Sequence, residues 1–377
     1  MTSFADLTTI GVGGPIATFL EPTTRVGVIE AVEEADSQGL PLCVIGGGSN
    51  MLVSDMPFEG VVVRDARRSI SVLDEAAPVE DDGRVVHVNA EAGCNWDDFV
   101  DYCVRLGLEG VEGLSGIPGT VGASVVQNIG AYGQEVATSV DSVEVWDRKE
   151  RAVKALRNDQ LAFGYRMSAL KASMYSAPAT PAAEFFPTPR YVVLSVTFAL
   201  RHSDTGVVGY GQLAKALDVA VGDRMNTADI RNAVLKVRAA KGMLEDAHRY
   251  ASPAMQGTKK TNLVDVALES QSKQNGDDGP DFNRHSCGSF FMNPILTPQQ
   301  AETLPEDAPR FDAALPGGGQ GVKTSAAWLI DHAGFHKGFK INENAPARLA
   351  KTVQDGVEAA FGIRLVPEPV VIGMNLK

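Results

Sequence analysis

The chain is poor in the residues that build metal centres and disulfide frameworks. Its 377 residues include four cysteines and six histidines, without a CxxC pair or an HExxH cluster. No metal site is therefore expected. Scattered, unpaired cysteines are typical of the reducing cytoplasm, where we expect the protein to act.

Basic residues are also scarce. Lys and Arg number 34 against 47 Asp and Glu, which leaves a formal net charge of −13. Such a chain has no general attraction for nucleic acid or for an anionic membrane surface, so neither is an expected partner. No apolar run approaches the ~18 residues of a membrane-spanning helix, so membrane insertion is not expected. The opening residues MTSFADLTTIGVGG lack the pattern of a signal peptide.

Hydrophobic residues make up 44% of the chain, enough for a buried core, and the length predicts two or three domains. Residues 23–55 alternate a helix, ended by Gly39, with a strand at 42–45, which is α/β in character. Strands and turns mix from 69 to 200, where the Ala- and Pro-rich stretch 172–190 is expected to be irregular. Further helices are predicted from Thr227 and over 347–361.

Two glycine-rich segments are the first candidates for a binding site. Residues 46–50, GGGSN, follow an apolar strand, and their backbone N–H groups can converge on phosphate oxygens. They match neither the GxGxxG nor the P-loop template, so a tight turn is an equally good interpretation. Residues 116–124, GIPGTVGAS, followed by QNIGAYG at 127–133, suit a backbone pressed against a flat ligand. Two such segments favour a bound cofactor over a packed Ω-loop.

Three polar residues stand in unusual surroundings. Ser289 lies between a glycine and two phenylalanines, but without a GxSxG elbow it is not a convincing hydrolase nucleophile, and a serine tolerated at a packing point is the usual explanation. Glu368 lies between two prolines in an apolar run, where a carboxylate is commonly paired or functional. Arg166, in FGYR, is a weak signal, because most arginines are surface charges.

Several motifs in a fixed order make these observations specific. They are IGGGSN, GIPGTVGAS, QNIGAYG, FGYR, GSFF-x-NP, WLID and VPEP. In this combination the chain resembles the UDP-N-acetylenolpyruvoylglucosamine reductases, from Thr8 to Glu368. The resemblance implies an α+β fold with a two-part FAD-binding region of the vanillyl-alcohol-oxidase (PCMH) type and a third, substrate-binding α+β domain. The corresponding divisions are 1–70 with 364–377, then 71–226, then 227–363.

The resemblance also implies the ligands and their contacts. FAD would be the cofactor, NADPH the reductant and an enolpyruvyl UDP-sugar the substrate. The residues matching the FAD contacts are Gly46, Gly47, Gly48, Ser49, Asn50, Gly116, Gly119, Thr120, Gly122, Ala123 and Ser124. Those matching the substrate contacts are Tyr165, Tyr210, Lys241 and Asn293.

Arg166, Ser289 and Glu368 match the family's catalytic residues. The substrate's double bond is conjugated with a carboxylate, so hydride arriving from the flavin at the terminal carbon leaves negative charge on the carboxylate. Arg166 would stabilise that charge, and a protonated Glu368 in an apolar site would donate a hydrogen bond to the same oxygens. Ser289 would then protonate the neighbouring carbon, with the phenylalanines excluding water and directing the hydroxyl.

The sequence departs from the family pattern late in the chain. After residues 332–339 the family continues with a strand containing a His- and Ala-rich apolar run, whereas residues 340–348 lead here almost directly into the last helix. We therefore expect a shortened third domain that lacks a strand. Two alternatives stay open: an FAD-dependent oxidase of a small alcohol or sugar, for which no histidine near GGGSN offers a covalent attachment, and an inactive flavin-binding module. The sequence does not reveal the oligomeric state; a monomer is the expectation.

Overall fold

The helix predicted to end at Gly39 is present, whereas the short helix α1 (Phe4–Leu7) was not predicted. The protein is described by a computed structural model over residues 1–74, 83–176, 187–255, 258, 284–315, 317–341, 345–374 and 376. Helix α2 (Arg25–Ser37) starts at its cap Thr24, whose hydroxyl accepts from Gly27 N, and is followed by Gly39 with φ of +63°. Its buried residues Val28, Val32 and Ala35 are those with helical spacing in the sequence.

The first structural part joins both ends of the chain. Strands β1, β4 and β2 form a parallel sheet, and the C-terminal strand β18 pairs in parallel with β3. The face of α2 packs with residues of this sheet and with Trp146, Val192 and Leu194 of the second part. The elements are α1 (Phe4–Leu7), β1 (Ile16–Leu20), β2 (Leu42–Val44), β3 (Met51–Val53), β4 (Phe58–Val63) and β18 (Val370–Ile372).

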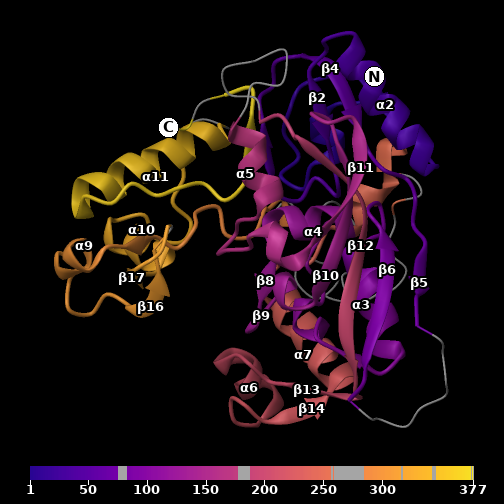
Figure 1. The fold of residues 1–377 in the computed structure, drawn as a ribbon. Helices are drawn as coiled ribbons and strands as arrows, with labels where there is room; N and C mark the ends of the chain where they lie inside the picture. Colours follow the sequence, from indigo (N-terminus) through magenta and orange to yellow (C-terminus); the bar gives the residue numbers. More distant parts are fainter. Residues whose placement is uncertain are drawn as a thin grey trace.

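The second part is built on a six-stranded antiparallel sheet whose long central strand is β12 (Figure 1). Alternating burial along β6 marks one face as core, where Trp96, Phe99 and Phe198 meet with ring centroids 4.4–6.0 Å apart. Helix α4 packs on β12. The elements are β5 (Ile70–Val72), β6 (Val85–Glu91), α3 (Trp96–Arg105), β7 (Leu108–Glu109), η1 (Glu112–Leu114), α4 (Val121–Gln127), β8 (Gly130–Ala131), β9 (Gln134–Glu135), η2 (Val136–Thr138), β10 (Val140–Asp147), β11 (Ala152–Arg157), η3 (Asn158–Leu161), α5 (Ala169–Ser176) and β12 (Tyr191–His202).

Helix α7 (Thr227–Ala240), which we expected to open the third domain, instead packs on the second part. It contacts α3, η1 and α6, and its Ile230 and Val234 share a core with Val208 and Leu213. This packing favours a domain boundary later in the chain. The neighbouring elements are β13 (Thr205–Val207), α6 (Gly211–Leu217) and β14 (Arg224–Asn226), followed by the short turns η4 (Ala247–Ala251) and η5 (Pro253–Met255).

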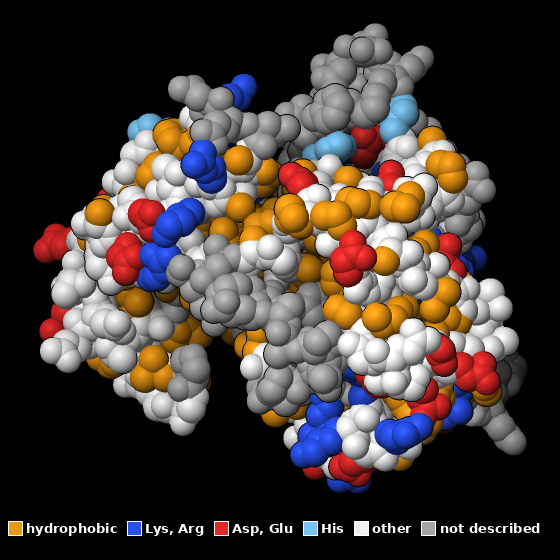
Figure 2. Space-filling model, turned by 90° about the horizontal axis from the view of Figure 1, so that it is seen from above, with side chains coloured by type: hydrophobic (Ala, Val, Ile, Leu, Met, Phe, Trp, Pro, Cys, Tyr) orange, Lys and Arg blue, Asp and Glu red, His pale blue; other side chains and the backbone are white. Residues whose placement is uncertain are grey.

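The third part lies to one side of the others, and Figure 2 shows a notch in the surface between them. A three-stranded sheet in the order β15-β17-β16 and three helices enclose their own core, with Phe291, Leu329 and Val357 buried. The described residues between α10 and α11, 333–341 and 345, contain no strand. The elements are β15 (Ile295–Leu296), α9 (Pro298–Glu302), β16 (Phe311–Ala314), β17 (Gln320–Lys323), α10 (Ala326–His332) and α11 (Pro346–Phe361).

One local prediction is wrong. Residues 172–176, expected to be irregular, are the last residues of α5, and the rest of that prediction up to 186 lies outside the described residues. In the second glycine-rich segment, α4 begins at Val121, immediately after its cap Thr120. Within the described ranges, no helix is both long enough and apolar enough to cross a bilayer.

Candidate active site

The two glycine-rich segments press against each other. A Cβ on Gly47 would lie 2.7 Å from the Gly119 Cα, and one on Gly46 would lie 2.6 Å from Thr120 Oγ1. Ser49 Oγ adds a hydrogen bond of 3.0 Å to the carbonyl of Pro118. Glycine is therefore required here because two backbones approach more closely than any side chain permits.

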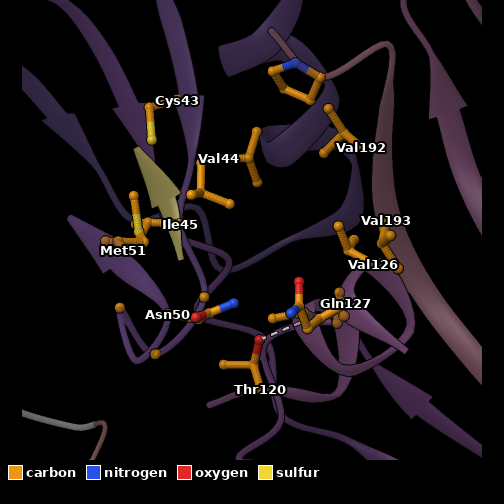
Figure 3. Close-up of a pocket in the computed structure, with 18 of the residues that line it drawn as sticks. Cys43, Val44, Ile45, Asn50, Met51, Thr120, Val126, Gln127, Val192 and Val193 are labelled. Atoms are coloured by element: carbon orange, nitrogen blue, oxygen red, sulfur yellow. Dashed lines mark hydrogen bonds between the residues drawn. The ribbon is translucent and has the colours of Figure 1, made fainter. Parts of the chain in front are cut away.

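A cavity opens beside this contact. It has a volume of about 1140 Å³ including its open mouth. Figure 3 shows Val44 and Ile45 of the first part facing Val126 of α4 and Val192 and Val193 of β12. This end of the cavity is apolar and lies between the two parts that we expected to hold FAD.

A second cavity, of about 1130 Å³ with its mouth, continues from the first. The wall residues common to both are Ser49, Asn50, Thr120, Ala123 and Gln127. Arg166, Ser289 and Glu368 all line the second cavity. The fold thus brings the three expected catalytic residues to one hollow, adjoining the glycine-rich walls.

Backbone pairing between distant segments places Ser289 beside Glu368. Glu368 N donates to the carbonyl of Phe290 at 2.8 Å, and Met292 N donates to the carbonyl of Val366 at 3.0 Å. This short antiparallel ladder fixes both segments without using either functional side chain. The positions of these two segments therefore do not depend on the side chains of Ser289 and Glu368.

Arg166 is held in a strained conformation. Its φ is +55°, in the left-handed region that non-glycine residues rarely adopt. Its Nη2 donates to the carbonyl of Gly130 at 2.8 Å, and its Nε lies 3.3 Å from Glu368 Oε1. Arg166 lies in a tight turn between Gly164 and Met167, and its side chain lines the cavity.

The surroundings of Glu368 are polar, so the expectation of an apolar site is wrong. Its side chain is 16% exposed, and Oε1 accepts a hydrogen bond of 3.2 Å from Gln127 Nε2 in addition to its pairing with Arg166. Both donors lie on Oε1.

The expected role of the phenylalanines is also wrong. Ser289 is exposed at the cavity mouth, whereas Phe291 is buried in the core of the third part and Phe290 packs against that core. The aromatic pair anchors the segment and does not wall in the hydroxyl. Cys287 also lines the cavity, but burial, reinforced by Glu368, raises the pKa of its thiol to about 12, which makes it a poor nucleophile at neutral pH.

The residues expected to bind substrate are only partly assembled at the cavities. Asn293 lines a third cavity shared with Ser289, although its Oδ1 already accepts from Ala326 N at 2.9 Å and caps α10. The Tyr165 ring lies 5.2 Å from the guanidinium carbon of Arg166 and 5.1 Å from Lys323 Nζ. Tyr165 is therefore a direct neighbour of the catalytic arginine.

Tyr210 and Lys241 lie on the α6–α7 side of the molecule. The Tyr210 ring packs edge-on against Tyr132 at 5.9 Å, and Lys241 Nζ donates to Gln212 Oε1 at 2.6 Å. Neither is among the residues that line the cavities described above. The tyrosine pair joins this side of the fold to the loop after α4.

Sequence reasoning missed Lys171. It lies on α5, is 5% exposed, and its Nζ donates to Gln127 Oε1 at 2.8 Å. Lysine is rarely buried without a partner, but a single lysine among small and apolar residues gives no signal in the sequence. Gln127 was quoted as part of a motif, yet its contact with Glu368 depends on tertiary structure.

The residues at the junction of the cavities fit a flavin. Asn50 Oδ1 is buried without a hydrogen-bond partner, and a buried acceptor of this kind is normally satisfied by a donor. The flavin ring system carries an N–H group and a flat apolar body, which suit this amide and the adjoining glycine-rich and valine-lined walls. In the part of the chain that the structure describes, no group of three or more His, Cys, Asp or Glu side chains could hold a metal ion.

Comparison with known proteins agrees with this reading. Residues 15–156 match the FAD binding domain, and residues 280–347 match the C-terminal domain of UDP-N-acetylenolpyruvoylglucosamine reductase. The UDP-N-acetylenolpyruvoylglucosamine reductases of Cutibacterium acnes and Thermobifida fusca are each 38% identical to this chain over 99% of its length, and 89% and 97% of those two proteins are covered.

The crystal structure of UDP-N-acetylenolpyruvylglucosamine reductase from Thermus caldophilus has a similar fold. It superimposes with a TM-score of 0.51 over 98% of this chain and 97% of that one, at 21% sequence identity. At that identity the structural comparison supports the fold alone.

Proposed function

This chain belongs to the UDP-N-acetylenolpyruvoylglucosamine reductase family, and from that premise we propose that Arg166, Ser289 and Glu368 carry out its reaction. As a member of the family it is an FAD-containing oxidoreductase that uses NADPH. It reduces UDP-N-acetyl-3-O-(1-carboxyvinyl)-glucosamine to UDP-N-acetylmuramate, a precursor of peptidoglycan. The observation that supports the residue roles is the single cavity lined by all three side chains.

FAD, held between the glycine-rich walls, would supply hydride chemistry, with NADPH as the reductant and the substrate's double bond as the acceptor. The protein's own task is to stabilise the charge that then develops on the substrate carboxylate. Arg166 supplies a fixed positive charge, and Gly130 and Glu368 hold its guanidinium before substrate arrives. Preorganised charge of this kind is worth more in a partly enclosed site than in water. Glu368 adds a hydrogen bond from Oε2 when protonated.

Ser289 completes the reaction by giving a proton to the carbon next to the carboxylate. An aliphatic hydroxyl is a weak acid, but an enolate is a strong base, so the transfer is favourable. The backbone pairing of Phe290 with Glu368 supports this role, because it holds the segment of Ser289 next to that of Glu368. The position of Ser289 at the cavity mouth supports access to a bound sugar nucleotide.

The remaining assignments are proposals of the same kind. The backbones of 46–50 and 116–124 flank the cofactor, and Tyr165 and Asn293 contact the substrate. Tyr210 and Lys241 contact the substrate from the α6–α7 side of the molecule, where both residues lie. We place the third domain after α7. The four unpaired cysteines support a cytoplasmic location, and a site assembled within one chain supports a monomer.

An anaerobic titration tests the function. The purified protein should be yellow, NADPH should bleach it, and the enolpyruvyl sugar nucleotide should restore the colour. Bleaching without recovery on adding the sugar nucleotide would contradict the reductase and favour the oxidase or the inactive flavin-binding module. A colourless protein that takes up no FAD on reconstitution would contradict the cofactor site itself.

A further inference from the structure

A buried lysine lies behind the catalytic pair. Lys171 Nζ donates to Gln127 Oε1 at 2.8 Å and to the carbonyl of Arg166 at 3.3 Å. Lys171 is 5% exposed, and its backbone N–H is also held in place, because it donates a hydrogen bond to Ser168 Oγ at 3.1 Å. A lysine is costly to bury, so its position needs a compensating interaction.

The contact with Gln127 determines which end of that amide meets Glu368. Lys171 has only donors to offer when charged, so it holds the Gln127 oxygen. The Gln127 nitrogen is then left to donate to Glu368 Oε1 at 3.2 Å. With the amide reversed, its oxygen would face the oxygen of Glu368 and repel it. A neutral side chain at 171 would remove this constraint.

The contact with the Arg166 carbonyl acts on the strained residue directly. Arg166 has φ of +55°, a conformation that persists only where its surroundings enforce it. Lys171 holds the carbonyl while Gly130 and Glu368 hold the guanidinium. The lysine is thus joined to both members of the Arg166–Glu368 pair without lining the cavity they share.

We propose that Lys171 is a positioning residue that orients Gln127 and Arg166 and adds a second positive charge behind the site. Resting on the proposed function, this role concerns binding of the substrate carboxylate. Arg166 pairs with Glu368 directly, and Lys171 lies behind Gln127, which links it to the same carboxyl group. With Lys171 charged, this group attracts an anion more strongly than Arg166 and Glu368 would without it.

The charged groups around Lys171 make the role dependent on pH. Burial lowers the pKa of Lys171 to about 8, Glu368 opposes this shift and Arg166 adds to it. Helix α4 packs on α5 and carries no charged side chain; η3 carries Asp159, which is exposed and pairs with Arg157. On α5 itself the other titratable side chain is Tyr175, which is largely exposed. Lys171 is thus charged below pH 8 and loses its charge as the pH rises through that value.

Two variants and a matched control test the inference. Lys171→Met removes the charge and the donors, Lys171→Arg keeps a permanent charge, and Lys149→Met removes an exposed lysine elsewhere. Substrate binding to the oxidised holoenzyme is followed by the change in flavin absorbance, and turnover is followed from pH 6 to 10. Lys171→Met should weaken substrate binding about 10- to 100-fold, with flavin content and bleaching by NADPH within about threefold of wild type.

The pH profile separates positioning from simple packing. Wild-type affinity for the sugar nucleotide should fall above about pH 8, and Lys171→Arg should move that fall to higher pH; Lys149→Met should follow wild type. Lys171→Met that binds substrate like wild type would overturn the inference. Should that variant fail to fold, a Lys171→Arg profile coinciding with wild type would overturn it as well. If the sugar nucleotide caused no change in flavin absorbance and no turnover in the wild-type enzyme, that result would instead refute the proposed function.

Discussion

Replacing Ser289 by alanine tests whether its hydroxyl donates a proton in the reaction or only supports the local structure. The exchange removes one oxygen atom from an exposed side chain. The backbone stays in place, because the bond from Glu368 N to the Phe290 carbonyl does not involve the hydroxyl. Folding stability should change by no more than ~0.5 kcal/mol, as for surface substitutions in general.

The expected loss falls on one half-reaction alone. A positioned general acid contributes about 10²- to 10⁴-fold to a rate, which corresponds to about 3–5 kcal/mol of activation free energy. Proton donation occurs only when the substrate is reduced. Reduction of the flavin by NADPH should therefore proceed at the wild-type rate, and reoxidation by the sugar nucleotide should slow by at least a hundredfold.

Stopped-flow absorbance under anaerobic conditions measures the two steps separately. Ser286→Ala is the matched control: it removes a hydroxyl three positions away that accepts a 3.0 Å hydrogen bond from Gly288 N. We expect this control to keep substrate reduction within about tenfold of wild type. If Ser289→Ala slowed both half-reactions equally, the Ser289 hydroxyl would not be the proton donor. If Ser286→Ala slowed substrate reduction as much as Ser289→Ala does, the shape of the segment would be responsible for the loss.

Three further outcomes are expected. Glu368→Gln should retain more substrate reduction than Glu368→Ala, because an amide can still donate a hydrogen bond; the reverse order in the flavin reoxidation rate would argue against a protonated Glu368. Gly47→Ala should lower the flavin content of the purified protein and its melting temperature, because the added methyl meets the Gly119 backbone at 2.7 Å; normal values of both would refute the close-contact argument. Burial opposes ionisation of Asp147, but hydrogen bonds, chiefly from Arg190, outweigh it and lower its pKa to about 2. This carboxylate therefore stabilises the fold above pH ~4, by on the order of 2 kcal/mol, and the contribution is lost as the pH falls toward 2. Denaturant unfolding of Asp147→Asn should differ most from wild type at neutral pH, and a gap that persists at pH 2 would contradict this.

Local sequence patterns were sufficient to predict a helix or strand that buries one of its faces. The spacing of Val28, Val32 and Ala35 predicted α2, and the stop at Gly39 followed from its positive φ. The alternating burial along β6 is likewise that of a half-buried strand, in the region 69–200 where strands were expected. Such patterns reflect the geometry of a single helix or strand, so no distant residue is needed to interpret them.

Sequence patterns did not predict features that depend on tertiary packing. Residues 172–176 look irregular beside the prolines that follow, yet they complete α5, which packs on α4. The resemblance implied a domain that starts at α7, but neither it nor the pattern of the helix states which core the helix joins. Its partners come from residues more than a hundred positions earlier as well as from its own neighbourhood.

The order of short motifs was enough to identify the family, the cofactor and the type of reaction, since each motif preserves residues whose chemistry the reaction needs. The positions of those residues in space depended on the fold. Pairing of Glu368 with the Phe290 carbonyl, the left-handed turn at Arg166 and the burial of Lys171 behind Gln127 all join segments far apart in the chain. Hydrogen bonds and ion pairs act over a few ångströms, and only the folded backbone brings such groups within that range.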